Sequence, residues 1–465
     1  MTFPGTDYPP TTIVGADQKV VAFLGDSIFD TGFTSTLPPV VGATQQFLNI
    51  APPGWIRFLT SQRCHTGQAN NFAHSGDTLS QIAVRVPALI ASAPDIVCIN
   101  GGTNDLAASA TFIDMRNTML NSILLPILTA GIDCIVTPIS PRPVSGIPAG
   151  WMQIWQRYNN WLRKLCRSHN LPFTNTGFSV PRRGKLYLAD VTKYWSNFAD
   201  ANGDPLANFL RDTVHPNAQG AYWYGRVFAD IINQIVPPGD YQQEHNGDYW
   251  NANNPSGNLL RSGSTNQGTL AGTGGTFTAS TGFTSGGTAI AAGWTFKRLA
   301  GTSTMVATTT KENPRTDGPN SGERQVIALA ASSTGTNDEQ YQFRFTSTFS
   351  IPVGDIKNGD IIQGGMSFEL DSHVGLTAAE LSISEFGGAV NQTSIDMARH
   401  AQSGIMPNSP APPFPISGVL RSEPITIQAD STGLTFSLVL HFDATAVNPA
   451  AVVKLADAWL RKVTD

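Results

Sequence analysis

Between residues 18 and 236, short apolar runs alternate with longer amphipathic stretches, and this alternation constrains the possible folds more than any other feature. The apolar runs predict strands at 20–24, 95–99 and 133–137. The amphipathic stretches predict helices at 79–92, 112–130, 151–168 and 217–235. Strands separated by helices are typical of a parallel sheet covered by helices on both faces. Such a sheet binds ligands at the carboxyl ends of its strands.

The pattern changes after Val236. Helical periodicity ends, Gly, Ser and Thr become frequent through residue 310, and short alternating runs follow, such as 341–345 and 434–440. Many short strands with glycine-rich turns predict an antiparallel β-sandwich. A chain of 465 residues is also too long for one ordinary domain. We therefore expect an α/β domain over 1–240, a linker over 241–255 and an all-β sandwich of jelly-roll type over 256–465.

Composition and charge argue against several classes of protein. The net charge of -5 does not fit a nucleic-acid-binding protein, which would carry basic patches. No run of 18 apolar residues occurs in the sequence, so we expect no membrane span. Residues 1–7 contain neither a basic n-region nor an apolar h-region, so no secretory signal is recognised. Export by another route, or release in a virus particle, stays open.

The four cysteines all lie in the first half of the chain, at Cys64, Cys98, Cys134 and Cys166. Cys98 and Cys134 fall in apolar strand-like runs, which favours buried free thiols, with a disulfide as the alternative. No Cys-x-x-Cys spacing indicates a zinc site. We expect neither a metal nor a cofactor.

A serine follows the first predicted strand, in the motif Gly25-Asp26-Ser27-Ile28. A serine hydroxyl is a weak nucleophile unless a base lies beside it, and it must be exposed, which a sharp strand-to-helix turn achieves. A helix that begins near Ser27 would direct its amide groups at a developing negative charge. The alternative is a serine that caps the helix, and for this motif alone that alternative is the stronger one.

A histidine suited to act as the base lies far downstream, in Asp212-Thr213-Val214-His215-Pro216. Asp212 is three residues before His215, so a short loop can turn both side chains toward one serine. The aspartate would orient the imidazole and stabilise the imidazolium. Pro216 stands where it would start the next helix. The alternative is a surface turn in which Asp212 caps that helix.

Two further motifs supply candidate donors for an oxyanion, Gly76 in Ala73-His74-Ser75-Gly76-Asp77 and Asn104 in Gly102-Thr103-Asn104-Asp105. The backbone amide of Gly76, the side-chain amide of Asn104 and the backbone amide of Ser27 would together hold the negative oxygen of a tetrahedral intermediate. Each motif alone also fits an ordinary turn.

The four motifs occur in the order serine, glycine, asparagine and Asp-x-x-His, and in this order the region 18–236 resembles the SGNH (GDSL) hydrolase family. The family's Ser, Gly, Asn and His match Ser27, Gly76, Asn104 and His215, with Asp212 as the acid. The resemblance implies a flavodoxin-like three-layer α/β/α fold and metal-free hydrolysis of acyl esters through an acyl-enzyme. The absence of a Gly-x-Ser-x-Gly motif argues against an α/β-hydrolase proper.

Neighbouring residues invite other roles. We expect Asp26 to stabilise the turn and His74 to be structural. Trp151, Trp155 and Trp161 recur at helical spacing, which favours core packing over a sugar-binding surface. Arg142 follows a predicted strand on the active side of the sheet, where it would meet an anionic substrate.

The second domain loosely resembles jelly-roll carbohydrate-binding modules, since Asn258-Leu259-Leu260 precedes Gly293-Trp294-Thr295-Phe296. Exposed aromatic residues such as Trp294, Tyr341 and Phe386 would stack on sugar rings, although aromatic residues of a sandwich more often lie in its core. For the domain as a whole, the alternative is a structural or oligomerisation domain. The pairing of an esterase domain with a sandwich predicts an acetylesterase that acts on a polysaccharide. The first candidate substrate is a capsular or other surface glycan, which a deacetylase of a phage tail would attack, and the second is xylan or pectin. The rival hypotheses are a lipase or thioesterase for longer acyl chains and an inactive glycan-binding protein.

Overall fold

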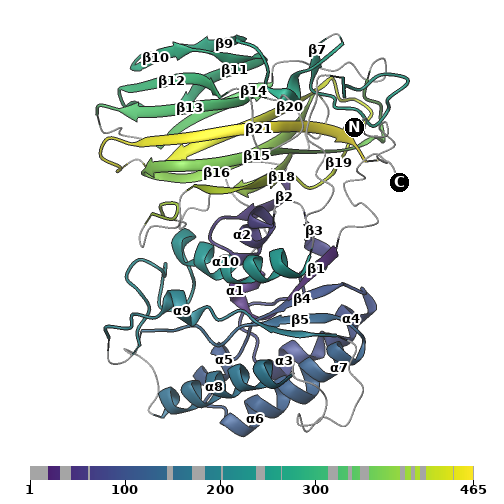
Figure 1. The fold of residues 1–465 in the computed structure, drawn as a ribbon, viewed down its shortest axis with the longest axis vertical. Helices are drawn as coiled ribbons and strands as arrows, with labels where there is room; N and C mark the ends of the chain where they lie inside the picture. The colour runs from purple at the N-terminus through teal and green to yellow at the C-terminus, as the bar shows by residue number, and fades with distance from the viewer. Residues whose placement is uncertain are drawn as a thin grey trace, which may run out of the picture.

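The computed structural model stacks an α/β domain and a β-sandwich along the longest axis of the molecule (Figure 1). The structure describes residues 19–31, 43–60, 63–143, 150–169, 184–200, 203–236, 247–262, 264–312, 323–333, 338–345, 355–387, 393–398, 404–408, 415–443 and 445–463. Residues 1–7, where no secretory signal was recognised, and 241–246 of the predicted linker lie outside these ranges.

The α/β domain contains a parallel sheet with the strand order β3-β1-β4-β5-β6 in the described residues. Its strands are β1 (Lys19–Leu24), β3 (Cys64–His65), β4 (Ile96–Ile99), β5 (Asp133–Val136) and β6 (Leu186–Leu188). The second strand of this sheet in sequence therefore lies outside the first, and the later strands follow on the other side. This is the flavodoxin-like order, as expected. The predicted strands at 20–24, 95–99 and 133–137 are confirmed.

Successive side chains along each strand point to opposite faces of this sheet, and both faces are apolar. Helices therefore cover both of them. Val21 and Phe23 pack in one apolar core with residues of α1, α2 and α10, whereas Ala22 and Leu24 pack in a second core with residues of α3, α4 and α6 to α8. The helices are α1 (Ser27–Asp30), α2 (Pro52–Leu59), α3 (Leu79–Val84), α4 (Val86–Ala91), α5 (Thr103–Ala107), α6 (Phe112–Asn117), α7 (Leu125–Thr129), α8 (Trp151–His169), α9 (Thr192–Trp195) and α10 (Ala218–Ile235).

Two of the predicted helices are interrupted. The stretch 79–92 breaks at Arg85 into α3 and α4, and Pro87 stands in the first turn of α4. The stretch 112–130 passes through a π-helical segment at Thr118–Leu124 before α7, whose first turn holds Pro126. Proline lacks the N–H that would continue the hydrogen-bond ladder, so both breaks have a local cause.

The β-sandwich consists of two large sheets in the described residues. One has the strand order β10-β12-β13-β21-β15-β18, with β19 beside β15, and the other has the order β2-β17-β16-β20-β14-β11-β9; β7 and β8 form a separate pair. The strands are β2 (Ala43–Leu48), β7 (Arg261–Ser262), β8 (Thr265–Asn266), β9 (Gly274–Thr278), β10 (Phe283–Thr288), β11 (Ile290–Ala300), β12 (Met305–Glu312), β13 (Arg324–Ala331), β14 (Glu339–Phe345), β15 (Ile361–Val374), β16 (Leu376–Phe386), β17 (Thr393–Ala398), β18 (Ile416–Arg421), β19 (Ile425–Thr426), β20 (Gly433–Phe442) and β21 (Ala450–Lys462).

Of the three aromatic residues named for sugar stacking, two lie in the core of the sandwich, so the core alternative is confirmed for them and the expectation of exposed rings is wrong. Trp294 and Tyr341 are buried, and Trp294 stacks on Phe343 with ring centroids 4.5 Å apart. Phe386 is half-buried. Alternation along β11 and β14 turns these rings inward, where large aromatic side chains fill the space between the sheets.

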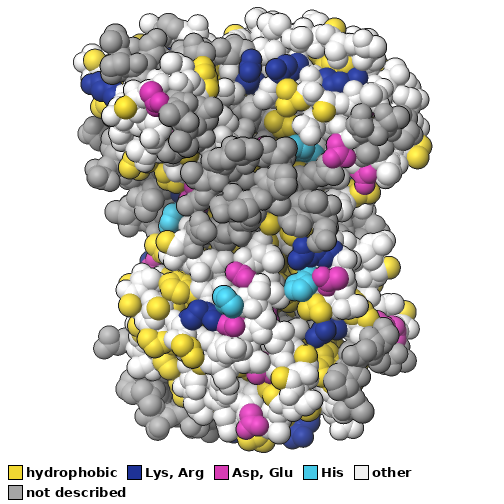
Figure 2. All heavy atoms as spheres, turned by 180° about the vertical axis from the view of Figure 1, so that it is seen from behind, with side chains coloured by type: hydrophobic (Ala, Val, Ile, Leu, Met, Phe, Trp, Pro, Cys, Tyr) yellow, Lys and Arg dark blue, Asp and Glu magenta, His cyan; other side chains and the backbone are white. Residues whose placement is uncertain are grey.

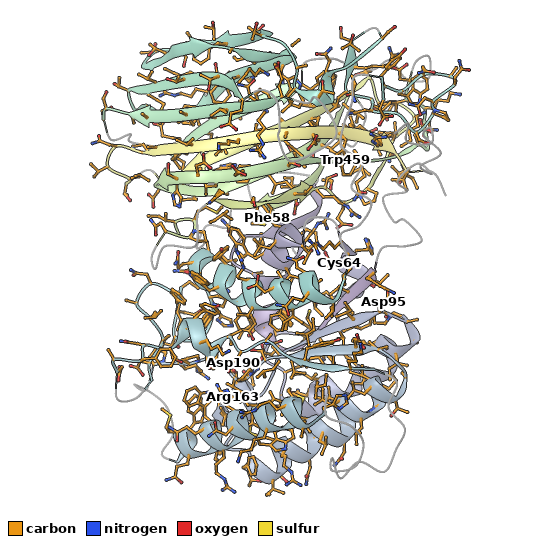
Figure 3. All side chains as sticks on the ribbon, viewed as in Figure 1. Phe58, Cys64, Asp95, Arg163, Asp190 and Trp459 are labelled. Carbon is orange, nitrogen blue, oxygen red and sulfur yellow. The ribbon has the colours of Figure 1, made fainter. Side chains whose placement is uncertain are left out.

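The two domains are joined by a segment that precedes most of the α/β domain in sequence. Strand β2 leaves that domain and pairs in parallel with β17 of the sandwich, and α2 then returns to pack against α10. Phe58 of α2 lies at the junction (Figure 3), and the centroid of its ring is 6.1 Å from that of Phe368 in β15. An apolar core therefore runs from one domain into the other.

A buried ion pair reinforces this junction. The guanidinium of Arg57 in α2 contacts the carboxylate of Glu423 and donates to the carbonyl oxygen of Ser422 at 3.1 Å. The carboxylate of Asp396 lies 4.0 Å from the Arg57 Nε. Burial raises the pKa of Asp396 to about 6, against the opposing effect of Arg57. A pair of this kind favours one defined arrangement of the two domains, since a charge left alone there would be costly.

The cysteines agree with another expectation. Cys64, Cys98, Cys134 and Cys166 are buried free thiols in the described structure. Across the described ranges, no helix combines the length and the apolar character that a membrane span needs. Figure 2 shows histidine, acidic and basic side chains near one another on the surface of the α/β domain seen from behind.

Candidate active site

Ser27 lies at the carboxyl end of β1, in a tight turn that leads into α1. The carboxylate of Asp26 caps this helix by accepting from the Ile28 N–H at 3.1 Å, and it also accepts from the Asn100 side-chain amide at 2.6 Å. A side chain at position 25 would bring its Cβ within 1.6 Å of the Asn100 Oδ1 atom. The turn therefore needs glycine at 25, and it leaves Ser27 half-buried at the start of a helix.

His215 lies within hydrogen-bond distance of Ser27, 188 residues earlier in the sequence. Its Nε2 atom is 2.9 Å from the Ser27 Oγ atom, and its Nδ1 atom is 2.8 Å from the Asp212 Oδ2 atom. The three side chains thus form one hydrogen-bonded series. Such a series lets the imidazole accept the serine proton at one nitrogen while the carboxylate holds the other.

The loop that carries Asp212 and His215 is held at both ends. The backbone N–H of Arg211 donates to the carbonyl oxygen of His215 at 3.0 Å, and the Asp212 Oδ1 atom accepts from the N–H groups of Val214 and His215, each at 2.7 Å. Partial burial would raise the pKa of the Asp212 carboxyl, but these hydrogen bonds and the His215 ring lower it overall. Asp212 is therefore held as a carboxylate facing His215.

The helix after this loop begins later than the sequence indicates. Pro216 does not start it; α10 starts at Ala218, and the side chain of Asn217 caps it by accepting from the Gly220 N–H at 3.0 Å. The capping role that was the alternative for Asp212 thus belongs to Asn217. Asp212 is left to contact His215.

Gly76 lies on the loop after β3 and Asn104 in the first turn of α5, and a hydrogen bond connects these two segments. Gly76 has a φ of +85°, which favours glycine, and no atom lies within 4 Å of the place where a Cβ would stand. The Asn104 Nδ2 atom donates to the carbonyl oxygen of Asp77 at 2.9 Å. The N–H of His74, two residues before Gly76, donates to the Gly25 carbonyl oxygen at 3.0 Å. The loop that carries Gly76 is thus bonded both to the turn before Ser27 and to Asn104 of α5.

The residues beside these motifs have mainly structural contacts. Asp26 is buried, and desolvation raises its pKa although Ile28 and Asn100 donate to it. His74 is exposed, with its Nδ1 atom 3.2 Å from the carboxylate of Asp77. Trp151 and Trp155 stack on each other at 6.4 Å between centroids, and Arg142 lies 5.9 Å above the Trp151 ring. Trp151 is buried, while Trp155 and Trp161 are half-buried against the core, so they do not form an open sugar platform.

Several residues that shape the site were not among the sequence candidates. Asn100 accepts from the Asp26 N–H at 3.3 Å and donates back to its carboxylate, so it fixes the turn before Ser27. Its signal in the sequence was a polar residue directly after an apolar strand. Arg85 and Asp77 also contact the loops, and nothing in their spacing pointed to this. Within the described ranges, no group of three or more His, Cys, Asp or Glu side chains is arranged to hold a metal ion.

Comparison with known proteins gives a family for the first domain. Residues 23–223 match the model of the GDSL-like Lipase/Acylhydrolase family. No curated protein is similar enough to the chain to count as a match.

Many solved structures are similar to part of the chain, among them the following three. A member of the lipolytic protein G-D-S-L family from Veillonella parvula DSM 2008 is 15% identical, with a TM-score of 0.33, over 47% of this chain and 100% of that one. A carbohydrate esterase family 3 protein from Talaromyces cellulolyticus is 19% identical, with a TM-score of 0.29, over 47% and 98%. Axe2, an acetylxylan esterase from Geobacillus stearothermophilus, is 19% identical, with a TM-score of 0.32, over 46% and 94%.

Proposed function

Since residues 23–223 form a GDSL-like lipase/acylhydrolase domain, we propose that the chain is a serine esterase with Ser27 as its nucleophile. The observation that carries this proposal is the hydrogen-bonded series from Ser27 through His215 to Asp212, at 2.9 Å and 2.8 Å. A structural serine that only caps a helix would have no need of an imidazole whose other nitrogen is held by a carboxylate.

In the proposed reaction, the Nε2 atom of His215 takes the proton of the Ser27 hydroxyl as the oxygen attacks the ester carbonyl carbon. The Asp212 carboxylate accepts from Nδ1 and stabilises the imidazolium. Collapse of the tetrahedral intermediate breaks the bond to the alcohol, which leaves with the proton from His215, and the acyl group stays on Ser27. A water molecule, deprotonated by His215, then attacks the acyl carbon. The bond between that carbon and the Ser27 Oγ breaks, His215 returns the proton to Ser27, and the acid is released.

The oxyanion in this reaction would be held by the backbone N–H groups of Ser27 and Gly76 and by the side-chain amide of Asn104. The bond from Asn104 to the Asp77 carbonyl oxygen supports this role, since it occupies one of the two amide protons and leaves the other to donate. The open space around Gly76 supports it as well, because a substrate oxygen must approach its N–H closely.

The substrate that fits best is an O-acetyl group on a polysaccharide, in the first place a capsular or other surface glycan. The side chains of Asp212 and His215 are 49% and 28% exposed, so the described part of the site lies near the surface, where the bulky alcohol part of a polymer can approach. The sandwich is locked beside the esterase domain by α2 and β2, which supports an enzyme with an extended substrate. Such an enzyme would work outside a bacterial cell, either as a free protein or as a component of a virus particle.

Hydrolysis of p-nitrophenyl esters with acyl chains of two, four, eight and twelve carbons tests the proposal. We expect the acetate ester to react fastest and Ser27→Ala to abolish the reaction. Ser168→Ala, which removes a half-buried hydroxyl bonded only to the Leu165 carbonyl oxygen among described residues, is the control and should stay active. A rate that rises with chain length would favour a lipase or thioesterase. Unchanged hydrolysis by Ser27→Ala would refute the assignment of the nucleophile.

The polysaccharide substrate needs a separate assay. Acetate released from acetylated capsular polysaccharide, acetylated xylan and acetylated pectin should be measured for the wild type and for Ser27→Ala. Ser27-dependent release from the capsular polymer supports the first choice. Ser27-dependent release from only xylan or pectin moves the assignment to plant cell-wall glycans, and release from none of them contradicts the polysaccharide proposal.

A further inference from the structure

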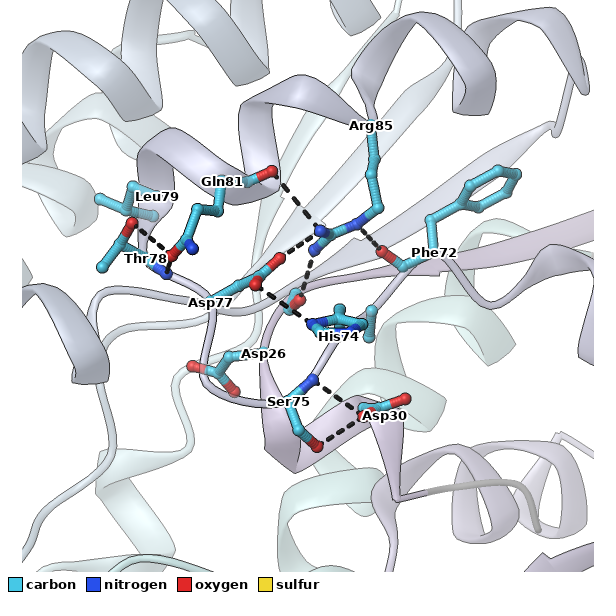
Figure 4. Close-up of polar contacts among 12 residues, drawn as sticks. Asp26, Asp30, Phe72, His74, Ser75, Asp77, Thr78, Leu79, Gln81 and Arg85 are labelled. Carbon is cyan, nitrogen blue, oxygen red and sulfur yellow. Dashed lines mark hydrogen bonds and ion pairs between the residues drawn. The ribbon is translucent and has the colours of Figure 1, made fainter.

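Arg85 stands at the break between α3 and α4. Its guanidinium donates to the Gln81 carbonyl oxygen of its own helix at 3.5 Å and to three separate parts of the site (Figure 4). The Nε atom donates to the Phe72 carbonyl oxygen at 2.5 Å, and one terminal nitrogen donates to the Gly25 carbonyl oxygen at 3.1 Å. The other terminal nitrogen pairs with the carboxylate of Asp77. The Arg85 side chain is 25% exposed and that of Asp77 8%, so this pair is mostly shielded from water.

The three acceptors surround the groups that the proposed reaction uses. Gly25 belongs to the turn that ends in Ser27, and Phe72 and Asp77 lie on either side of Gly76. The carbonyl oxygen of Asp77 accepts from the Asn104 side-chain amide at 2.9 Å. One guanidinium is therefore connected, through one or two bonds, to the segments that carry all three proposed oxyanion donors.

The loop at 72–78 is attached to β1 and to the turn after it by two backbone bonds, from the Phe72 N–H to the Phe23 carbonyl oxygen at 2.7 Å and from the His74 N–H to the Gly25 carbonyl oxygen at 3.0 Å, both before Gly76. It is irregular, it passes through a positive φ at Gly76, and the space beside Gly76 is open. Ser75 adds a further attachment, since its N–H donates to the carboxylate of Asp30 in α1 at 2.8 Å. Oxyanion donors act only when they are held at the position where charge develops, so the bonds that locate this loop bear directly on the rate.

From this arrangement we propose that Arg85 is a positioning residue, which sets the Gly76 and Asn104 donors relative to Ser27. The inference rests on the proposed esterase function. Arginine suits this role because its planar fork donates in three directions at once, to two carbonyl oxygens and a carboxylate. A lysine ammonium at the end of a flexible chain keeps the charge beside Asp77 but cannot hold all three acceptors in the same geometry.

A purely structural role is the alternative, since Arg85 also lies at a helix break. The described chain offers a matched control in Arg163, whose side chain is 25% exposed and whose partner Asp190 is 9% exposed (Figure 3). Arg163 joins α8 to the segment after β6 and bonds Asp190 and Thr192, not the loops at 25–27 or 72–78. Arg163→Gln therefore loses an ion pair of equal burial away from the proposed donors.

The experiment compares kcat and KM for p-nitrophenyl acetate, together with the melting temperature, in the wild type, Arg85→Gln, Arg85→Lys and Arg163→Gln. We expect kcat of Arg85→Gln to fall by about 100-fold with little change in KM, the loss expected for a donor displaced by about 1 Å. Arg85→Lys should recover less than a tenth of the wild-type kcat. Arg163→Gln should lower the melting temperature as Arg85→Gln does but keep its kcat. If Arg85→Gln does not fold, Arg85→Lys carries the same comparison.

A double-mutant cycle with Asn104→Ala separates positioning from general stabilisation. If Arg85 acts through the oxyanion donors, Arg85→Gln should cost far less in the Asn104→Ala background than in the wild type. The inference would be overturned if the fold-loss in kcat of the double variant equalled the product of the losses of the two single variants. It would also be overturned if Arg85→Gln had a kcat close to that of Arg163→Gln. A wild type without Ser27-dependent hydrolysis would instead refute the proposed function, and the role of Arg85 with it.

Discussion

Replacing Asp212 by asparagine tests the proposed role of this carboxylate with almost no change in shape. The Oδ1 atom can still accept from the N–H groups of Val214 and His215, each at 2.7 Å in the wild type. At the other position an NH₂ group replaces the oxygen that lies 2.8 Å from the His215 Nδ1 atom. An NH₂ group there favours the tautomer in which Nδ1 accepts, so that Nε2 carries a proton and cannot take one from Ser27.

The magnitude follows from the 2.8 Å separation of Nδ1 and Oδ2. Opposite unit charges at that distance attract by about 1.5 kcal/mol at a dielectric constant of 80 and by about 6 kcal/mol at 20. The Asp212 side chain is 49% exposed, which places it between these limits. We therefore expect Asp212→Asn to lose about 3 kcal/mol of transition-state stabilisation, or roughly 150-fold in kcat/KM.

The assay is the hydrolysis of p-nitrophenyl acetate, with Asp230→Asn as the control. Asp230 is 41% exposed and pairs with Arg226 on α10, so it has a similar environment without a contact to His215 in the described structure. Asp230→Asn should keep the wild-type kcat/KM. A loss of less than about threefold in Asp212→Asn, below 1 kcal/mol, would show that the carboxylate neither orients nor stabilises the imidazole.

Three further predictions concern stability. Gly25→Ala would place its Cβ 1.6 Å from the Asn100 Oδ1 atom, so we expect a loss of about 1–3 kcal/mol in the free energy of unfolding, measured by urea titration, and a lower kcat. Burial raises the pKa of Asp105 to about 6, above its unfolded value of 3.8. The folded state then binds the extra proton, so this carboxyl lowers stability as the pH rises from about 4 to 6, by up to about 3 kcal/mol. Asp105→Asn should therefore be more stable than the wild type at pH 7 but not at pH 4. An equal difference in the free energy of unfolding at the two pH values would show that the raised pKa of Asp105 is not the cause. Arg57→Met leaves Glu423 buried without its partner and should cost about 3–5 kcal/mol, seen by calorimetry as an earlier transition at the domain junction.

Much of the α/β domain was predictable because its signals are local. The apolar runs before Gly25 and Asn100 are short and β-branched, so strand formation needs no distant partner to be recognised. The polar motifs followed these runs directly, and the carboxyl ends of parallel strands meet at one edge. The structure accordingly brings Ser27 and His215 together. The breaks at Arg85 and in the π-helical segment were missed, since apolar periodicity continues across a kink.

The course of β2 and the burial of sandwich aromatics could not be predicted in the same way. An isolated strand pattern does not say which sheet it joins, so nothing in residues 43–48 pointed to β17, about 350 residues later. Alternation along β11 and β14 was visible, but it does not state which of its two faces is the inner one. The sequence therefore left sugar stacking and core packing both open for Trp294 and Tyr341, and the structure places both residues in the core.

Local patterns along the chain were enough to predict the nature of the first domain, the order of its motifs, and Ser27, Asp212 and His215 as partners. These depend on local periodicity and on a short spacing, three residues in the case of Asp212 and His215. The bonds of Arg85 to Gly25, Phe72 and Asp77, and the link that Arg57 makes between the two domains, became visible only in the folded arrangement. Contacts of this kind depend on how helices pack on the sheet and how the domains pack on each other, and packing of distant segments leaves no periodic trace in the chain.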